Sequence, residues 1–333
     1  MKRAIHLATA FALATLCLCA NAGAKVATIE IPGAIFVAPL SINDKGQVTG
    51  VYEDASKRRH GFLWQPHAAL ATFDVAGADD TYPAAISAAG VITGRCYVSG
   101  LDAGFVRAAD GSTTIFNVPR GTITRPAGIN RNGWIAGYLL HGVRDRHPIP
   151  FLMSPSGDAT EFTVPGATGG ASGVVVNNSQ MVAGQALVET DDGRRGFIRT
   201  PDGTATMFGA PNVDFIVAGM NDAGTIAGTL AADNLAQGFI RTIDGTLTYF
   251  IAPNGSLSTV IAAINNAGTI AGGFVDSEGR TWHGFIRTAD ETFTPFDVRG
   301  STYTQILAMN NKGAIAGVYT NKDGVTLAFA GKP

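Results

Sequence analysis

The sequence predicts an all-β fold, a seven-bladed β-propeller with four strands in each blade. Three observations predict it. A nine-residue motif, clearest as INNAGTIAG, occurs seven times at spacings of 43 to 47 residues. Each copy is followed by a Phe, usually after Gly, and then by a short apolar segment that ends in a Pro or Gly turn. Four short strands in about 44 residues match the size of a propeller blade.

The motif itself predicts the first two strands of each blade and the turn between them. The copies start at residues 42, 86, 129, 176, 220, 264 and 309. In Asn-x-x-Gly the Asn side chain accepts a hydrogen bond from the backbone two residues on, and the Gly adopts a left-handed conformation. We expect a structural hairpin rather than a ligand loop, because a ligand would not need seven symmetric sites. In the fourth copy Gln180 replaces the Gly, which predicts either a different turn or a strained residue.

The third and fourth strands follow each motif. The Phe of the third strand stands at 62, 105, 151, 197, 239, 285 and 329. Pro-Asp-Gly at 201–203 and Ile-Asp-Gly at 243–245 are hairpin signals between these two strands. No segment shows a sustained 3.6-residue period with caps, so we expect almost no helix.

The two ends of the chain predict how the ring closes. Thr28–Ile31 resembles a fourth strand with no first three before it, and the chain ends after a third strand around Phe329. The N-terminal strand should therefore complete the last blade, which makes residues 25–333 one propeller domain. Such closure removes the exposed strand edges that promote aggregation.

Residues 1–24 predict a secretory signal peptide. Lys2 and Arg3 precede an apolar run from Ala8 to Ala20, and small residues allow cleavage after Ala22 or Ala24. No later stretch is long and apolar enough for a membrane helix, so we expect a chain exported to the periplasm or the extracellular space. Cys96 is the only cysteine after residue 24, so no internal disulfide can form in the mature chain.

Composition excludes several partners. The chain has 24 basic and 26 acidic residues, which argues against nucleic acid as a partner. No metal, P-loop or dinucleotide motif occurs, so we expect no metal and no cofactor. His60 and His283 occupy equivalent repeat positions and are interpreted as architectural. We expect a monomer.

Seven copies of I-N-x-x-G-x-I-x-G, each followed by a Phe element such as His60-Gly61-Phe62 or His283-Gly284-Phe285, resemble the HAF-repeat proteins. These are probable extracellular bacterial proteins named for a His-Ala-Phe triplet. The resemblance covers residues 25–333 and implies export and a repeat architecture. It implies no catalytic residues.

Residues that depart from the repeat are the candidates for function, because structural residues recur and functional ones need not. The between-blade loops and the loops joining second and third strands are predicted to share one face, where propellers usually bind ligands. The third repeat has the longest spacing, with extra residues in an enlarged loop, HGVRDRHPIP, at 141–150. The candidate binding residues on this face are Asp80, Tyr82, Arg125, Arg146, His147, Asp214, Phe215, Trp282, Tyr303 and Gln305.

Two hypotheses of function follow. The first is a secreted, non-catalytic propeller that binds a protein or glycan through this face. The alternative is an extracellular hydrolase or lyase acting on polysaccharide at the channel mouth, by analogy of fold. Its available catalytic groups are Asp80, Asp214 and His60, which lie in different repeats, and no catalytic residue is assigned.

Overall fold

The computed structural model describes residues 25–190, 193–232, 235–253 and 258–333. These residues form 28 β-strands and no helix, so the all-β class is confirmed. Among them, no helix offers a span long and apolar enough to cross a membrane. The predicted signal peptide, residues 1–24, lies outside the described residues.

Five sheets contain four strands each and one contains eight. One sheet is formed by β1 (Lys25–Ile29), β28 (Thr326–Lys332), β27 (Ile315–Thr320) and β26 (Tyr303–Met309). The next four are β2 (Ala34–Ile42), β3 (Val48–Asp54), β4 (Arg59–Trp64) and β5 (Ala71–Phe73); β6 (Asp80–Ile86), β7 (Ile92–Val98), β8 (Leu101–Arg107) and β9 (Thr113–Phe116); β10 (Ile123–Ile129), β11 (Ile135–Leu140), β12 (Ile149–Met153) and β13 (Ala159–Glu161); and β14 (Ala171–Val176), β15 (Val182–Leu187), β16 (Arg194–Arg199) and β17 (Ala205–Phe208). The eight-stranded sheet holds β18 (Asp214–Met220), β19 (Ile226–Ala232), β20 (Leu235–Arg241), β21 (Leu247–Phe250), β22 (Ser258–Ile264), β23 (Ile270–Val275), β24 (Trp282–Arg287) and β25 (Phe293–Phe296).

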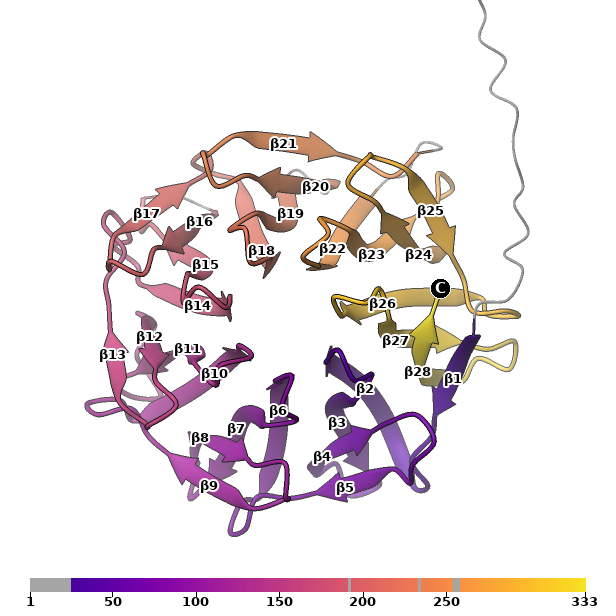
Figure 1. The fold of residues 1–333 in the computed structure, drawn as a ribbon, viewed down its shortest axis with the longest axis horizontal. Helices are drawn as coiled ribbons and strands as arrows, with labels where there is room; N and C mark the ends of the chain where they lie inside the picture. The colour runs from indigo at the N-terminus through magenta and orange to yellow at the C-terminus, as the bar shows by residue number, and fades with distance from the viewer. Residues whose placement is uncertain (1–24, 191–192, 233–234, 254–257) are drawn as a thin grey trace, which may run out of the picture.

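The sheets stand radially around a central opening, as in a β-propeller (Figure 1). The first strand of each repeat lies nearest the centre and the fourth lies at the rim. The chain proceeds once around the ring, and β1 then pairs antiparallel with β28. In the eight-stranded sheet, one parallel pairing among the described residues, Ala236 with Ser258, joins β20 to β22.

The motifs that contain Asn form the predicted Asx turn. Oδ1 of Asn43 accepts hydrogen bonds from the backbone N–H groups of Lys45 and Gln47, both at 3.0 Å. The same pair of bonds forms at Asn130, Asn177, Asn221, Asn265 and Asn310. The motif glycines have φ between 73° and 92°, the left-handed region that glycine occupies without steric cost. The glycines are therefore turn residues, as predicted.

The same Asn side chains link neighbouring repeats. Nδ2 of Asn43 donates to the carbonyl of Ser87 at 3.0 Å, and Nδ2 of Asn130 donates to the carbonyl of Asn177 at 2.8 Å. Nδ2 of Asn310 donates to the carbonyl of Asn43 at 2.8 Å, which joins the last motif to the first. Each of these Asn side chains is buried and bonded on both sides, so the turn also fixes the spacing between repeats.

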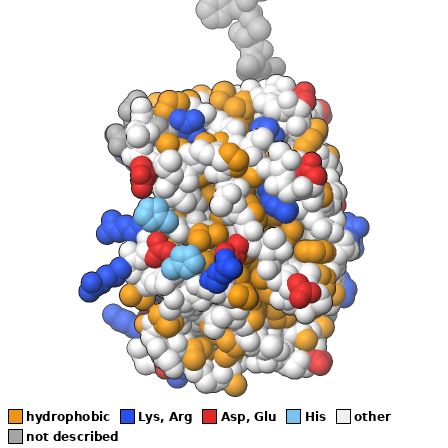
Figure 2. Space-filling model, turned by 90° about the vertical axis from the view of Figure 1, so that its left-hand side faces the viewer, with side chains coloured by type: hydrophobic (Ala, Val, Ile, Leu, Met, Phe, Trp, Pro, Cys, Tyr) orange, Lys and Arg blue, Asp and Glu red, His pale blue; other side chains and the backbone are white. Residues whose placement is uncertain are grey.

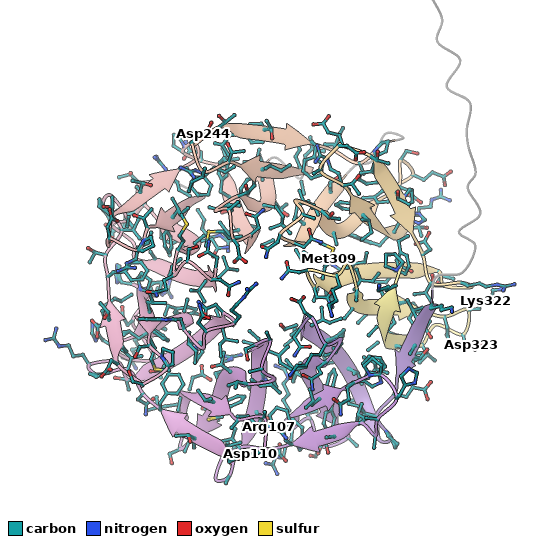
Figure 3. All side chains as sticks on the ribbon, in the orientation of Figure 1. Arg107, Asp110, Asp244, Met309, Lys322 and Asp323 are labelled. Atoms are coloured by element: carbon teal, nitrogen blue, oxygen red, sulfur yellow. The ribbon has the colours of Figure 1, made fainter. Side chains whose placement is uncertain are left out.

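A second circle of contacts lies beside the first. In five repeats the residue after the Asn uses its backbone N–H to donate to the side chain of the corresponding residue in the next repeat, as Asp222 does to Oδ1 of Asn266 at 2.9 Å. These residues line a cavity of about 200 Å³ at the end of the channel where the Asn turns lie, near Met309 (Figure 3). The members of the circle are Arg131, Asn178, Asp222, Asn266, Asn311 and Asp44.

The Gly that ends each motif lies under the Phe of the third strand. Gly50 pairs with Phe62, and a Cβ on Gly50 would lie 2.1 Å from the carbonyl oxygen of Ala38 and 2.7 Å from the Phe62 ring. The equivalent Phe is 0% exposed in every repeat. The pairs are Gly50–Phe62, Gly94–Phe105, Gly137–Phe151, Gly184–Phe197, Gly228–Phe239, Gly272–Phe285 and Gly317–Phe329. This packing explains why Gly and Phe recur in each repeat.

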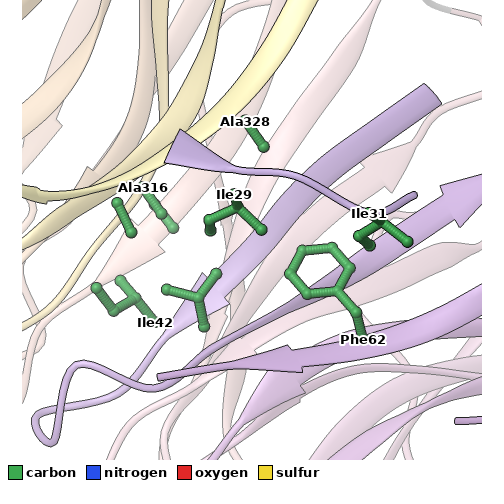
Figure 4. Close-up of a cluster of buried hydrophobic side chains, with 9 residues drawn as sticks. Ile29, Ile31, Ile42, Phe62, Ala316 and Ala328 are labelled. Atoms are coloured by element: carbon green, nitrogen blue, oxygen red, sulfur yellow. The ribbon is translucent and has the colours of Figure 1, made fainter. Parts of the chain in front are cut away.

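The N-terminal strand is part of the core rather than an appendage. Ile29 is 1% exposed and packs with Ile42 and Phe62 of one sheet and with Ala316 and Ala328 of another (Figure 4). Five residue pairs from Lys25–Lys332 to Ile29–Ala328 tie β1 to β28. Thus β1 bridges the two ends of the chain by hydrogen bonds and by buried apolar surface.

The fourth motif keeps the ordinary turn despite Gln180. Oδ1 of Asn177 accepts from Ser179 and Met181, and the φ of Gln180 is 64°. The turn does not change; instead Gln180 occupies a left-handed conformation that disfavours a side chain. The expectation of a different turn is therefore wrong, and Gln180 adopts nearly the backbone conformation of the glycines in the other repeats.

Replacing Gln180 by Gly should raise the stability of the protein. Relief of the left-handed conformation outweighs the greater flexibility of an unfolded Gly, for a net gain of roughly 0.5–1 kcal/mol. Gly313→Ala is the matched control, because Gly313 has a φ of 73° and no atom lies within 4 Å of the position that a Cβ would take. The free energy of unfolding of this variant should fall by a similar amount. Urea denaturation midpoints measure both changes, and equal midpoints for Q180G and wild type would contradict the assignment of strain.

Truncating Ile29 to Ala should destabilise the protein by roughly 2–5 kcal/mol, because it opens a cavity in a buried cluster. Ile35→Ala provides the control, since Ile35 is 59% exposed and its loss should change stability by less than about 0.5 kcal/mol. Thermal or denaturant unfolding compares the two. A small effect for I29A would show that β1 is not part of the cooperative fold.

Cys96 should be chemically inert in the folded protein. Its side chain is 0% exposed, and burial, with a smaller contribution from Asp102, raises the pKa of its thiol to about 11. At pH 8 the native thiol should react with a thiol-specific disulfide reagent at least about 100-fold more slowly than the urea-unfolded chain. Comparable rates in the two states would show that β7, which contains Cys96, separates readily from its neighbouring strands.

Candidate functional site

The loops that precede each first strand contact the loops between second and third strands, so both sets share one face, here called the loop face. Nε of Arg58 donates to the carbonyl of Asp79 at 3.0 Å, and the backbone N–H of Arg59 donates to Asp80 at 2.8 Å. The Asn turns lie on the opposite face, next to the third-to-fourth strand loops, as the bond between Gln47 and Gln65 shows. On the side of the ring seen in Figure 2, basic side chains project mainly toward one face.

Asp80 and Asp214 serve the loops rather than a common site. Oδ1 of Asp80 accepts from the backbone of Arg59. Oδ1 of Asp214 accepts from both the backbone and Nε of Arg194, at 2.8 and 3.0 Å, and the pKa of Asp214 is lowered by that pairing. The two carboxylates belong to sheets that are not adjacent in the ring (Figure 1). They do not converge as an acid–base pair would require.

Phe215 is a core residue and not part of a binding surface. It is 1% exposed and its ring centroid lies 5.3 Å from that of Phe239 and 6.1 Å from that of Phe208. Its position in β18 corresponds to Thr81 in β6, which is also buried. The sequence interpretation of Phe215 as a loop residue was wrong. β18 already starts at Asp214, and the alternation of side chains along the strand directs Phe215 into the sheet packing.

The remaining candidates fall into separate groups. The Tyr303 hydroxyl donates to Gln305 at 2.8 Å, and the Trp282 ring lies 6.5 Å from that of Tyr303. His147, in the enlarged third-repeat loop, lies 3.3 Å from Glu189, and Arg146 beside it is exposed. Tyr82 and Arg125 are the pair that the structure brings into one pocket.

This pocket, here called the Tyr–Arg pocket, has a volume of about 450 Å³, within the range of roughly 300–1,000 Å³ typical of small-ligand sites. It lies between the first strands of two neighbouring sheets, β6 and β10. Tyr82 pairs across the ladder with Arg95, and Arg125 pairs with Tyr138. Its lining residues are Leu40, Tyr82, Pro83, Ala84, Arg95, Arg125, Pro126, Ala127 and Tyr138.

A buried carboxylate holds the two arginines in place. The side chain of Asp102 is 8% exposed, and its Oδ2 lies 3.1 Å from Nη1 of Arg95 and 2.6 Å from Nη2 of Arg125. Nε of Arg125 donates to the same oxygen at 2.7 Å. Burial lowers the pKa of Arg125, but its bonds to Tyr138 and Asp102 outweigh this and raise the pKa above its ordinary value. Asp102 therefore holds both guanidinium groups in place.

The tyrosines are positioned by the same cations. The guanidinium carbon of Arg95 lies 4.3 Å from the centre of the Tyr82 ring, and that of Arg59 lies 5.4 Å from it. Nη1 of Arg125 donates to the Tyr138 hydroxyl at 3.3 Å. Stacking of Arg on an aromatic face stabilises both groups by about 0.5–2 kcal/mol, so the pocket is preorganised.

Sequence reasoning missed Arg95, Asp102 and Tyr138. The available signal was at Asp102, which stands two residues before Gly-Phe, where Arg59 and Arg194 stand in other repeats. A reversal of charge at one repeat position marks a place where the symmetry is broken.

Another cavity of about 450 Å³ lies on the opposite face, between the first and last repeats, and includes Trp64 and Pro66. Its cations are the exposed lysines 25, 45, 312 and 332. Because these side chains are not held by buried partners, this cavity is less preorganised than the Tyr–Arg pocket.

The histidines make equivalent contacts in two repeats. His60 stacks on Tyr52 and lies 2.8 Å from Asp74, and His283 stacks on Phe274 and lies 2.8 Å from Asp297. This repetition suits an architectural role. Across the described ranges, no group of three or more His, Cys, Asp or Glu is arranged to hold a metal ion.

No protein-family model matches the chain, and no curated protein matches it. Solved structures do. Virginiamycin B lyase from Staphylococcus aureus, with quinupristin, is 13% identical, with a TM-score of 0.58 over 93% of this chain and 99% of that one. The β-propeller domain of the trilobed protease from Pyrococcus furiosus is 11% identical, with a TM-score of 0.62 over 90% and 94% of the two chains. At such identities the similarity shows that the chain has the β-propeller fold.

Proposed function

We propose that this protein is a non-catalytic binding module whose ligand, a glycan or a protein segment, occupies the Tyr–Arg pocket on the loop face. The observation that carries the proposal is the pocket itself. In two adjacent repeats Tyr82 faces Arg95 and Arg125 faces Tyr138, while the corresponding pair in β2 and β3 is Ala38 and Val51. Aromatic and Arg side chains held rigid at a concave surface are typical anchors of binding sites.

The chemistry of the pocket favours binding over catalysis. The carboxylate beside it, Asp102, is 8% exposed and is engaged by both Arg95 and Arg125, so it is not free to act on a ligand. Asp80 and Asp214 are engaged elsewhere. The alternative of a polysaccharide hydrolase or lyase rests on fold analogy with neighbours that are enzymes, and the same fold hosts many functions.

The same proposal includes a fold of seven blades, with β1 closing the ring. It is supported by the seven motif copies, by the single bridge within the eight-stranded sheet and by the β1–β28 ladder. Export of the mature chain, and membership of the HAF-repeat proteins, are part of the proposal on the strength of residues 1–24 and the repeat motif.

A glycan and peptide array probed with residues 25–333 tests the function. We expect at least one ligand whose binding falls at least tenfold in the double variant Tyr82→Ala, Tyr138→Ala, because both pocket anchors are removed. Tyr249→Ala is the control: Tyr249 is 49% exposed on the outer strand β21, and its loss should leave binding unchanged. Undiminished binding in the pocket variant, or turnover of a polysaccharide by the wild-type protein, would overturn the proposal.

A further inference from the structure

The Tyr–Arg pocket carries a positive charge in a protein whose net charge is −2. Arg95 and Arg125 line it, Arg59 reaches the Tyr82 hydroxyl at 3.4 Å, and Asp102 is the carboxylate bonded to the first two. Each of Arg95 and Arg125 remains one-third exposed. Arg59 is paired with Glu53 at 3.1 Å, so the excess charge comes from Arg95 and Arg125, two cations that share the single carboxylate of Asp102. A ligand anion would neutralise this excess.

Beside these cations the pocket has an apolar floor. Leu40, Pro83, Ala84, Pro126 and Ala127 form it, and the two Tyr hydroxyls stand at its polar side. A ligand that fits therefore combines an anionic group, several hydroxyls and a flat apolar face. A pyranose ring that carries a carboxylate has all three features: its C–H face is apolar, its hydroxyls are hydrogen-bonding groups, and its carboxylate matches the planar donors of Arg.

The backbone of the pocket disfavours the other common carboxylate ligand, an extended peptide end. Peptides usually add to an exposed strand edge through main-chain hydrogen bonds. Pro83 and Pro126 stand in the two innermost strands of the pocket, and proline has no backbone N–H to donate. The ladder shifts register directly after both prolines, which interrupts the edge further.

We infer that the Tyr–Arg pocket recognises the uronic acid units of an acidic polysaccharide, with Arg95 and Arg125 bonding the uronate carboxylate and the Pro and Ala floor packing against the sugar ring. This inference rests on the proposed binding function and names its ligand class.

Isothermal titration with a panel of uronate oligosaccharides tests it, each paired with its carboxyl-reduced neutral form. The panel contains oligomers of galacturonate, glucuronate, mannuronate and guluronate. At least one uronate should bind at least tenfold more tightly than its reduced form. Arg95→Gln with Arg125→Gln should abolish that difference. Arg280→Gln serves as the charge-matched control, since Arg280 is 80% exposed on a loop and should not contribute.

Asp102→Asn gives a result that misfolding cannot imitate. The Asn oxygen can still accept from Arg95 and Arg125 and keep them in place, while the competing negative charge is removed. Uronate binding should therefore tighten by severalfold while neutral sugars are unaffected. Absence of binding by every uronate up to millimolar concentration overturns the inference, as does equal affinity for acidic and reduced sugars. If neutral sugars bind and require Tyr82 and Tyr138, the binding function stands and the uronate assignment fails. If a peptide carboxylate binds and its binding depends on Arg125, the ligand is a peptide and the uronate inference is overturned.

Discussion

A glycine that lies beneath an aromatic ring holds each sheet of this protein together. Gly50 lies between the carbonyl of Ala38 and the ring of Phe62, and both are so close that a Cβ at this position would clash with them. The absence of a side chain lets the first strand bulge toward the second and lets the Phe cover both. Because this arrangement recurs in each repeat, each sheet has the same close approach of its first two strands and the same buried Phe.

Repetition also determines where variation is tolerated. The Asn turn, the Gly and the Phe occupy the strand ends and the sheet interior. Tyr82 and Arg95 instead pair with one another across the β6–β7 ladder. These positions differ between repeats, so two adjacent repeats carry a charged and aromatic pocket while others carry pairs such as Ala38 with Val51 or Gln305 with Val318 there.

The sequence was sufficient for the strands, turns and the pairing of the chain ends, because each depends on residues within one repeat or on its regular recurrence. Tyr82 and Arg125 were found as departures from the repeat. Arg95 and Asp102 were not, because their importance comes from contacts between neighbouring sheets, and those distances are not encoded in local spacing. Phe215 was misassigned because one step of strand register exchanges a surface position for a core position.

The pairing of β1 with β28 has a consequence for how the molecule opens. Chain ends are usually the parts of a protein that fray most easily. Here the first described residue, Lys25, sits opposite Lys332 in a ladder, and Ile29 is buried between two sheets. The amide hydrogens that bond β1 to β28 can exchange with solvent only when these two strands separate, and that same event exposes Ile29. Opening of the terminal strands should therefore require a free energy close to that of global unfolding, whereas in most proteins the chain ends open at a lower free energy.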